Sequence, residues 1–387
     1  MKRLVGILII LVLSISILAE VGVYQDKVVV GSFQALSGPY AVIGQEMTKG
    51  MKAYFNWINK RGGVYGRKIE LIVADDQLNP AKTVVEVKRL VEQDKVFALV
   101  GGLGTYGCLA VMDYVEQNKV PFVYQGSGAS QLVLPPKKYI FAVQPDYTLE
   151  GALIAKYVAE IAKFKNPAIV YMNNDVGLEG YAAFKGELAK YKMTPSVEIS
   201  YNPADTDYSG LVIKLVDKNP DVVVVYGLLT DTVRWVKTIR DYGLNSKVIT
   251  TYANADPSFL TLAGKYAEGV IFTGWVPLPT PDRPAFVRDY QRAVSIHQET
   301  YAKELPSSYA VAGFIAAEVF TEGLIRAGKN LTREGLVKAL ESFKHWDGIL
   351  SKDITWGPNL RRGKSSLYFL AVKGNQFVPL TDLIQYQ

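Results

Sequence analysis

The chain has 387 residues, among them 43 Lys and Arg, 37 Asp and Glu, and a single cysteine. Its charges are mixed along the sequence and form no basic stripe, which argues against a nucleic-acid partner. One cysteine excludes an internal disulfide, and the length allows two domains that each bury a core.

The first nineteen residues have the pattern of a secretory signal peptide. Lys2 and Arg3 precede an uncharged stretch over residues 4–18, and Ala19 then precedes the first acidic residue. The apolar stretch is shorter than the ~20 residues that a membrane-spanning helix needs. We therefore expect cleavage near Ala19 and a periplasmic mature protein without stable membrane insertion. An uncleaved membrane anchor is the alternative.

From residue 27 onward, short β-rich runs alternate with helical patterns. The strands predicted in the first block are 28–32, 69–74, 96–100 and 121–124. A helix between the first two strands is indicated by Met47, Met51 and Phe55 at helical spacing. A second helix opens at Asn79, a favoured N-cap residue before a first-turn proline, and a third covers 106–117.

The same alternation starts again near residue 144. The predicted helices are 151–162, 181–191, 208–218 and 231–242, and the predicted strands are 168–171, 197–200, 221–227, 247–251 and 269–273. Alternating strands and helices favour parallel sheets covered on both faces, and two blocks favour two such units.

The last third of the chain follows a different pattern. Four prolines, at 277, 279, 281 and 284, mark a connection, and three helical patterns follow up to about residue 343. Two short β-like pieces, 354–356 and 368–372, close the chain.

The segment from Gly102 to Gly107 fits the G-x-G-x-x-G pattern of dinucleotide-binding loops. That fingerprint also needs an acidic residue about twenty positions later, at the end of the next strand, to hold a ribose. Here the next strand ends in Tyr124-Gln125-Gly126-Ser127, so no nucleotide cofactor is expected. The turn can still present N–H groups at a helix start, which attract an anion.

No other motif predicts catalysis or a metal. His297 and His345 are the only histidines and lack partners at metal-ligand spacing, and no serine stands in a nucleophile motif. Cys108 lies in an apolar stretch and is expected to be a buried small hydrophobe. An enzyme is therefore not expected, and neither is a cofactor.

Several segments, in this order and spacing, resemble the leucine/isoleucine/valine-type periplasmic solute-binding proteins of ABC importers. They are 36–39 (LSGP), 57–59 (WIN), 62–67 (GGVYGR), 79–80 (NP), 120–121 (VP) and 243–244 (GL). The resemblance covers almost the whole chain after residue 27.

The resemblance implies an α/β type I periplasmic binding fold, in which two doubly wound parallel-sheet lobes enclose a ligand cleft. Three hinge crossovers would fall near Gln144, Trp275 and Thr355. The first lobe would then comprise 20–143 plus 275–354, and the second lobe 144–274 plus 355–387.

Members of this family hold the ligand's carboxylate with hydroxyl and N–H groups after two first-lobe strands. The matching candidates here are Thr105, Tyr106, Gly126, Ser127, Gly128 and Ala129. Thr105 matches a family serine, although a plain helix N-cap is the alternative reading. Gly128 replaces a family threonine, so Ser127, Ser130 or the backbone alone would have to compensate.

The second-lobe candidates depart from the family further. Tyr252 stands where amino-acid binders have a glutamate for the ammonium group, and Val176 and Leu228 stand where they place tyrosines. Ile43 and Tyr309 match apolar or aromatic contacts. Either Asp231 or Asp256 supplies the missing charge, or the ligand is a keto, hydroxy or aromatic acid without an ammonium group.

We therefore expect a monomeric, non-catalytic component of an ABC importer that closes on a small carboxylate and is read by a membrane permease. A hydrophobic amino acid or a related acid is the expected ligand. A ligand-sensing regulatory protein of the same fold is the alternative.

Overall fold

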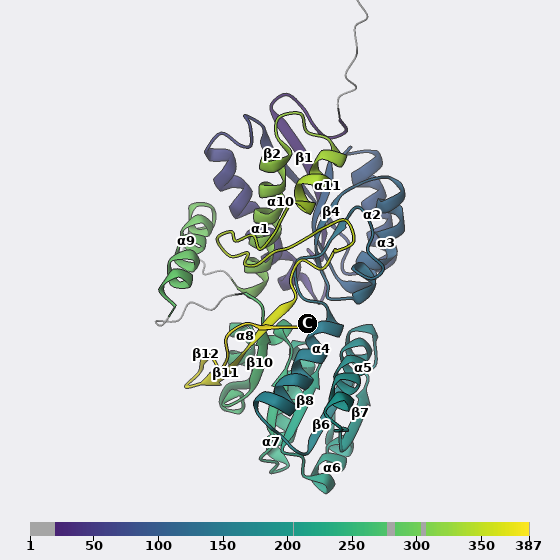
Figure 1. Cartoon of the computed structure of the whole chain (residues 1–387), viewed down its shortest axis with the longest axis vertical. Helices are drawn as coiled ribbons and strands as arrows, with labels where there is room; N and C mark the ends of the chain where they lie inside the picture. Colours follow the sequence, from purple (N-terminus) through teal and green to yellow (C-terminus); the bar gives the residue numbers. More distant parts are fainter. Residues whose placement is uncertain (1–19, 204, 277–282, 303–306, 387) are drawn as a thin grey trace, which may run out of the picture.

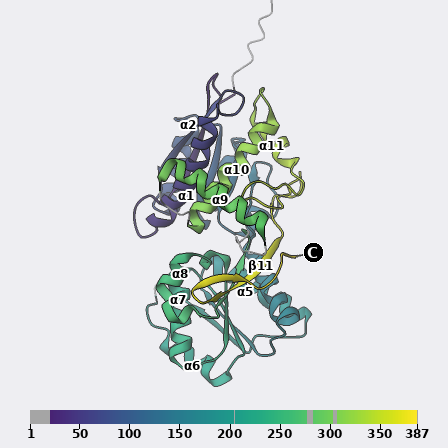
Figure 2. The same ribbon diagram turned by 90° about the vertical axis from the view of Figure 1, so that its left-hand side faces the viewer.

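A computed structural model describes residues 20–203, 205–276, 283–302 and 307–386. In these residues the chain forms two α/β lobes, one above the other in Figure 1 and seen from the side in Figure 2. The predicted signal peptide, and Pro277, Pro279 and Pro281 of the predicted connection, lie outside the described residues. Pro284 begins a helix.

The first sheet is parallel throughout, with strand order β2-β1-β3-β4-β5. Its strands are β1 (Lys27–Gln34), β2 (Lys68–Asp75), β3 (Ala98–Leu103), β4 (Phe122–Gly126) and β5 (Ile140–Phe141). Neighbouring residues of a strand point to opposite faces, so Val28 and Val30 join one core cluster and Val29 joins another. The predicted coverage of both faces is confirmed for this sheet.

The helices around the first sheet come from both ends of the chain (Figure 1). They are α1 (Ala41–Lys60), α2 (Pro80–Glu92), α3 (Thr105–Gln117), α9 (Pro284–Tyr301), α10 (Ser308–Ala327) and α11 (Arg333–Glu341). By length and composition α10 is apolar enough to cross a membrane, but most of it is buried and it packs against α1, β3 and β4. It is a core helix of this lobe.

The second sheet has the order β12-β11-β10-β9-β8-β6-β7, with β13 paired to β11. The strands are β6 (Pro167–Met172), β7 (Val197–Tyr201), β8 (Val222–Tyr226), β9 (Lys247–Thr250), β10 (Ile271–Gly274), β11 (Ser366–Lys373), β12 (Gln376–Pro379) and β13 (Ile384–Gln385). The helices are α4 (Tyr147–Lys156), α5 (Asp175–Lys190), α6 (Ser209–Lys218), α7 (Leu229–Asp241) and α8 (Pro257–Ala263), with short turns η2 (Tyr157–Ile161), η3 (Tyr252–Asn254) and η4 (Gly264–Ala267). The strands β11 and β12 are antiparallel to their neighbours, unlike the parallel core of the sheet.

The chain passes between the sheets at three places. It leaves the first sheet after β5, returns after β10, and enters the second sheet again before β11. The last passage lies later than the predicted position at Thr355. Trp356 is fully buried among first-lobe residues, 5.3 Å from the Phe141 ring, and Ala142 still pairs with Arg362. The division into hinged lobes stays a prediction, with its third crossing shifted to residues 363–365.

Two elements next to the candidate site begin or end at residues other than those predicted. The strand predicted to end at Val100 runs on to Leu103, and the helix predicted to begin at Gly151 begins at Tyr147. Asp146 caps this helix by accepting a hydrogen bond from the N–H of Leu149. In consequence, the carboxyl ends of β3 and β4 face the start of α4.

Candidate functional site

Three hydroxyl groups meet where β3 and β4 end and α4 begins. Thr105 Oγ1 lies 2.8 Å from Ser127 Oγ and 3.4 Å from the hydroxyl of Tyr147. All three side chains are buried. We call Thr105, Ser127 and Tyr147 the hydroxyl cluster. Parallel strands end at the same edge of a sheet, which is why residues 22 positions apart become neighbours here.

The turn before α3 frees the Thr105 hydroxyl for this contact. Gly104 occupies the N-cap position with φ +97°, a conformation that favours glycine, and no side chain caps the helix. The N–H of Gly104 donates to the carbonyl of Gly126, which ties the two loops together at 3.1 Å. Ser127 Oγ accepts from the N–H of Ala129 at 3.1 Å. The alternative reading of Thr105 as a helix cap is therefore wrong.

Gly128 lies against two tyrosines of the second lobe. A Cβ atom at this position would stand 2.6 Å from the Tyr147 ring and 2.8 Å from the Tyr252 hydroxyl, closer than real Cβ contacts. The carbonyl of Gly128 also accepts from the N–H of Tyr147 at 2.7 Å. The threonine that the family has here would not fit, because these phenols fill its space.

The Tyr252 hydroxyl is held by the segment through which the chain first passes from one lobe to the other, at Gln144 and Pro145. It donates to the carbonyl of Pro145 at 2.9 Å and accepts from Gln144 Nε2 at 3.1 Å. Gln144 Oε1 in turn accepts from the Tyr124 hydroxyl of β4 at 2.9 Å. Burial raises the pKa of Tyr252 well above its usual value, so the phenol is neutral. It offers a hydrogen bond and no charge.

A fully buried carboxylate, Glu150 of α4, stands behind these tyrosines. It accepts hydrogen bonds from the Tyr252 N–H at 2.9 Å, from the Tyr226 hydroxyl at 2.8 Å, and from the hydroxyl of Thr273. Burial raises the pKa of Glu150 to about 7, because an ionised carboxylate is costly away from water.

Both second-lobe aspartates considered from the sequence are engaged elsewhere. Asp231 is buried beside Arg234 at 3.5 Å and the Tyr208 hydroxyl at 3.4 Å. Asp256 caps α8 through Ser258 and also accepts from the N–H of Ser308 at 2.9 Å. No described hydrogen bond or ion pair joins either carboxylate to the hydroxyl cluster or to Tyr252.

The remaining predicted residues have no described contact to the hydroxyl cluster. Ile43 and Tyr309, near the starts of α1 and α10, pack against the first-lobe core. Val176 packs against the second-lobe core near the start of α5. Leu228 and Tyr106 are exposed, at 38% and 49%.

Sequence reasoning missed Tyr147, Tyr226 and Glu150. The signal for Glu150 was present, because it is the one acidic residue in the run 149–155 (LEGALIA), and an acidic side chain there needs buried partners. Tyr147 would have required the earlier helix start that Asp146 defines.

The glycines of the segment 102–107, which fits the pattern of a nucleotide-binding loop, allow close packing of neighbouring side chains. A Cβ at Gly102 would lie 2.3 Å from the Phe33 ring, and one at Gly107 would lie 2.7 Å from Thr83 Oγ1. Cys108 is fully buried, as predicted. Among the residues described, no group of three metal-ligating side chains of His, Cys, Asp or Glu gathers.

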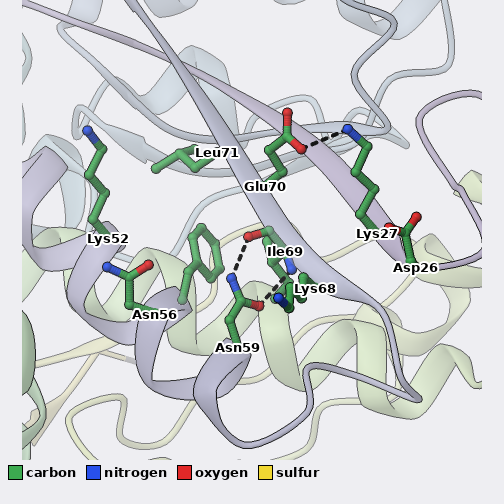
Figure 3. Close-up of a pocket in the computed structure, with 10 residues that line it drawn as sticks. Asp26, Lys27, Lys52, Asn56, Asn59, Lys68, Ile69, Glu70 and Leu71 are labelled. Carbon is green, nitrogen blue, oxygen red and sulfur yellow. Dashed lines mark hydrogen bonds and ion pairs between the residues drawn. The ribbon is translucent and has the colours of Figure 1, made fainter.

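A separate depression of about 540 Å³ follows the free edge of β2 (Figure 3). Asn59 of α1 covers part of this edge by bonding both the N–H and the carbonyl of Ile69, each at 2.8 Å. All of its lining residues belong to the first lobe, so this depression, unlike the hydroxyl cluster, is not formed between the lobes. The interface around the hydroxyl cluster is therefore the better candidate site.

Comparison with known proteins identifies the family and the fold of this chain. Residues 27–376 match the family model described as periplasmic binding protein. A Leu/Ile/Val-binding protein homolog 3 of Brucella melitensis is 26% identical over 322 residues, which cover 83% of this chain and 84% of the relative. An amino acid binding protein of Pseudomonas aeruginosa is 26% identical over 325 residues, 83% of this chain and 86% of the relative.

Solved structures show the same fold. A leucine binding protein from Thermotoga maritima gives a TM-score of 0.79 at 20% identity, covering 92% of this chain and 98% of that one. A fatty acid ABC transporter substrate-binding protein from Thermomonospora curvata gives 0.82 at 22% identity, covering 95% of both chains.

The chain belongs to the periplasmic binding protein family, and the predicted resemblance to its leucine/isoleucine/valine type is confirmed. Members of this family bind solutes and catalyse no reaction. The protein is accordingly a solute-binding protein and not an enzyme.

Proposed function

We propose that this protein is the periplasmic component of an ABC importer and captures a small carboxylate between its lobes. The observation that carries the proposal is the hydroxyl cluster, in which Thr105 and Ser127 of the first lobe meet Tyr147 at the start of α4. Hydroxyl donors beside a helix N-terminus are suited to a carboxylate, since hydrogen bonds to an ionised acceptor are stronger than neutral ones.

The family relatives support a hydrophobic ligand. The Brucella relative is named for leucine, isoleucine and valine, and the Thermomonospora structure is named for fatty acids. A carboxylate attached to an apolar group is common to both names. Ile43 and Tyr309, which the resemblance assigns to side-chain contacts, are compatible with such a group.

The residues of the second lobe favour a ligand that is an acid without an ammonium group. Tyr252 offers a neutral phenol at the position of the family glutamate, and Asp231 and Asp256 have other partners. Glu150 is fully buried behind Tyr252, and its oxygens already accept from Tyr252, Tyr226 and Thr273, so it offers no direct contact to an ammonium group. An ammonium group enclosed without a counter-charge costs several kcal/mol, whereas a keto or hydroxy oxygen can bond to a phenol.

In the proposed mechanism the carboxylate docks on the first-lobe half of the site, and the second lobe then closes. Closure removes water, which strengthens each hydrogen bond to the charged group. The ligand stabilises the closed form only through contacts that the open form lacks. A membrane permease would then receive the closed protein, which we expect to be a monomer released by cleavage near Ala19.

Side-by-side calorimetric titration tests the ligand class. We expect 4-methyl-2-oxopentanoate and phenylpyruvate to bind at least as tightly as leucine and phenylalanine, because they avoid the desolvated ammonium group. Amino acids that bind about tenfold more tightly, a difference near 1.4 kcal/mol, would overturn the preference. If Asp231→Asn or Asp256→Asn then removed that advantage, the missing counter-charge would be identified.

A further inference from the structure

The buried carboxylate of Glu150 bonds to several elements next to the candidate site. Its carboxylate joins the ends of three neighbouring strands: Tyr226 ends β8, Tyr252 follows β9, and Thr273 lies in β10. Glu150 itself is on α4, one turn after Tyr147. A single buried group therefore connects α4 to the strand ends that face the first lobe.

Two routes lead from Glu150 to the hydroxyl cluster and its surroundings. Through the Tyr252 N–H it holds the residue whose hydroxyl reaches Gly128 and Pro145. Through Tyr226, whose hydroxyl also lies 3.3 Å from the carbonyl of Tyr147, it holds the start of α4.

We propose that Glu150 is a positioning residue of the ligand site, which orients Tyr252 and Tyr147 and whose charge state governs how well the site accepts an anion. The proposal rests on the carboxylate-binding function proposed above. An ionised Glu150 places a negative charge behind the site and repels the ligand, whereas a protonated Glu150 does not.

Glu150 and Glu179 are carboxyl groups near the candidate site whose pKa values are raised by burial, and Glu179 bonds the N–H of Ser130 and none of the three strand ends. The phenols of Tyr226 and Tyr252 have pKa values raised by burial, and Asp146 is ion-paired with Arg362. From α5, the residues nearest to α4 at Gly151 are Gly180 and Ala183, which carry no charge. The raised pKa of Glu150 agrees with this setting.

Glu150→Gln removes the negative charge of the side chain and keeps its size and shape. The glutamine amide can accept from the Tyr252 N–H and donate to a reoriented Tyr226 hydroxyl, so the hydrogen-bonded frame survives without the charge. Glu150→Ala removes both. Glu318→Gln is the matched control, because Glu318 is an equally buried carboxylate that accepts from Leu350 and Ser351 in the first lobe, away from the cleft.

The first readout needs no ligand: hydrogen exchange of the peptide containing the Tyr252 amide, followed by mass spectrometry. We expect Glu150→Ala to speed exchange about tenfold or more, and Glu150→Gln and Glu318→Gln to change it little. Unchanged exchange in Glu150→Ala would refute the positioning role.

The second readout is the pH profile of affinity for 4-methyl-2-oxopentanoate. The wild type should bind about five- to tenfold more weakly near pH 8 than near pH 6, and so should Glu318→Gln, whereas the profile of Glu150→Gln should be flat. A wild-type profile that stays flat, or a Glu150→Gln profile that matches the wild type, refutes the charge effect. If neither this acid nor leucine binds the wild type, the proposed ligand class fails, and the exchange experiment still decides the positioning role.

Discussion

In the candidate site the hydroxyl of Thr105 bonds to a neighbouring loop and does not cap helix α3. Its neighbour Gly104 takes the N-cap position, and the hydroxyl of Thr105 bonds instead to Ser127. The proposed function requires this hydroxyl to donate to the carboxylate of the ligand instead of bonding to Ser127.

Thr105→Ala should therefore reduce affinity and leave stability almost unchanged. Loss of one hydrogen bond to a carboxylate costs roughly 1.5–3 kcal/mol, or about ten- to a hundredfold in Kd. Thr332→Ala is the matched control, because Thr332 does cap α11 by accepting from the N–H of Gly335 at 2.9 Å. That variant should lose about 1 kcal/mol of stability and no affinity. Calorimetry and thermal unfolding of both variants make the comparison, and equal affinities for Thr105→Ala and wild type would contradict it.

The space around Gly128 is limited by two tyrosines that lie far from it in the sequence. Tyr147 and Tyr252 approach it so closely that a side chain would have to displace them. These two tyrosines therefore leave no space for the threonine that the resemblance assigns to this position. Tyr252 is held by hydrogen bonds to Pro145 and Glu150, and the N–H of Tyr147 donates to the carbonyl of Gly128 itself.

At the scale of elements, two carboxylates of the second lobe hold backbone N–H groups of the first lobe. Asp256 at the start of α8 accepts from Ser308 in the first turn of α10, at 2.9 Å. Glu179 of α5 accepts from the N–H of Ser130, also at 2.9 Å. These contacts join elements of the two lobes that the chain connects only through the three passages between sheets.

Asp256→Asn should favour the open arrangement of the lobes. Asparagine is as good an N-cap as aspartate, so α8 keeps its cap, but one oxygen becomes an NH₂ group that cannot accept from Ser308. We expect a larger radius of gyration by small-angle X-ray scattering and a loss of affinity of about five- to thirtyfold, or roughly 1–2 kcal/mol.

The control for this variant is Asp207→Asn. Asp207 makes the same local contacts to the residue two positions on, with Ser209 N at 2.8 Å and Ser209 Oγ at 3.0 Å, and no described contact to the first lobe. It should leave the scattering profile as in the wild type. If Asp256→Asn gives that same unchanged profile, the contact between α8 and α10 has no role in closure.

For the whole molecule, buried carboxylates dominate the expected pH dependence of stability near neutral pH. Burial raises the pKa of Glu150 from 4.5 to about 7 and also raises the pKa of Glu318. A raised folded-state pKa means that the folded protein binds protons more readily than the unfolded chain. The stabilisation is full below about pH 4.5 and is lost as the pH rises through about 7.

Thermal unfolding should therefore show a falling Tm between about pH 5 and pH 8. The Glu150 contribution to this fall is roughly 2–4 kcal/mol by the size of its pKa shift, and Glu150→Gln should remove it. Lys364, whose pKa is lowered by burial to about 8, opposes this fall only at the upper end of the range, because its contribution to stability rises as the folded protein loses that proton. A Glu150→Gln protein whose Tm falls with pH as steeply as that of the wild type would count against this account.

Local sequence patterns were sufficient to predict the two α/β lobes, the family, the loops that hold Thr105 and Ser127, and the burial of Cys108. Hydrophobic periodicity, glycine and proline signals, and segment order are local properties that can be read along the chain. The folded arrangement was needed to show that Tyr147 completes the hydroxyl cluster, that Tyr226 and Tyr252 share the carboxylate of Glu150, and that Asp256 bonds across the lobes. These are contacts between residues up to 102 positions apart, as from Glu150 to Tyr252. Such contacts depend on sheet order and on how the lobes face each other, which no local pattern encodes.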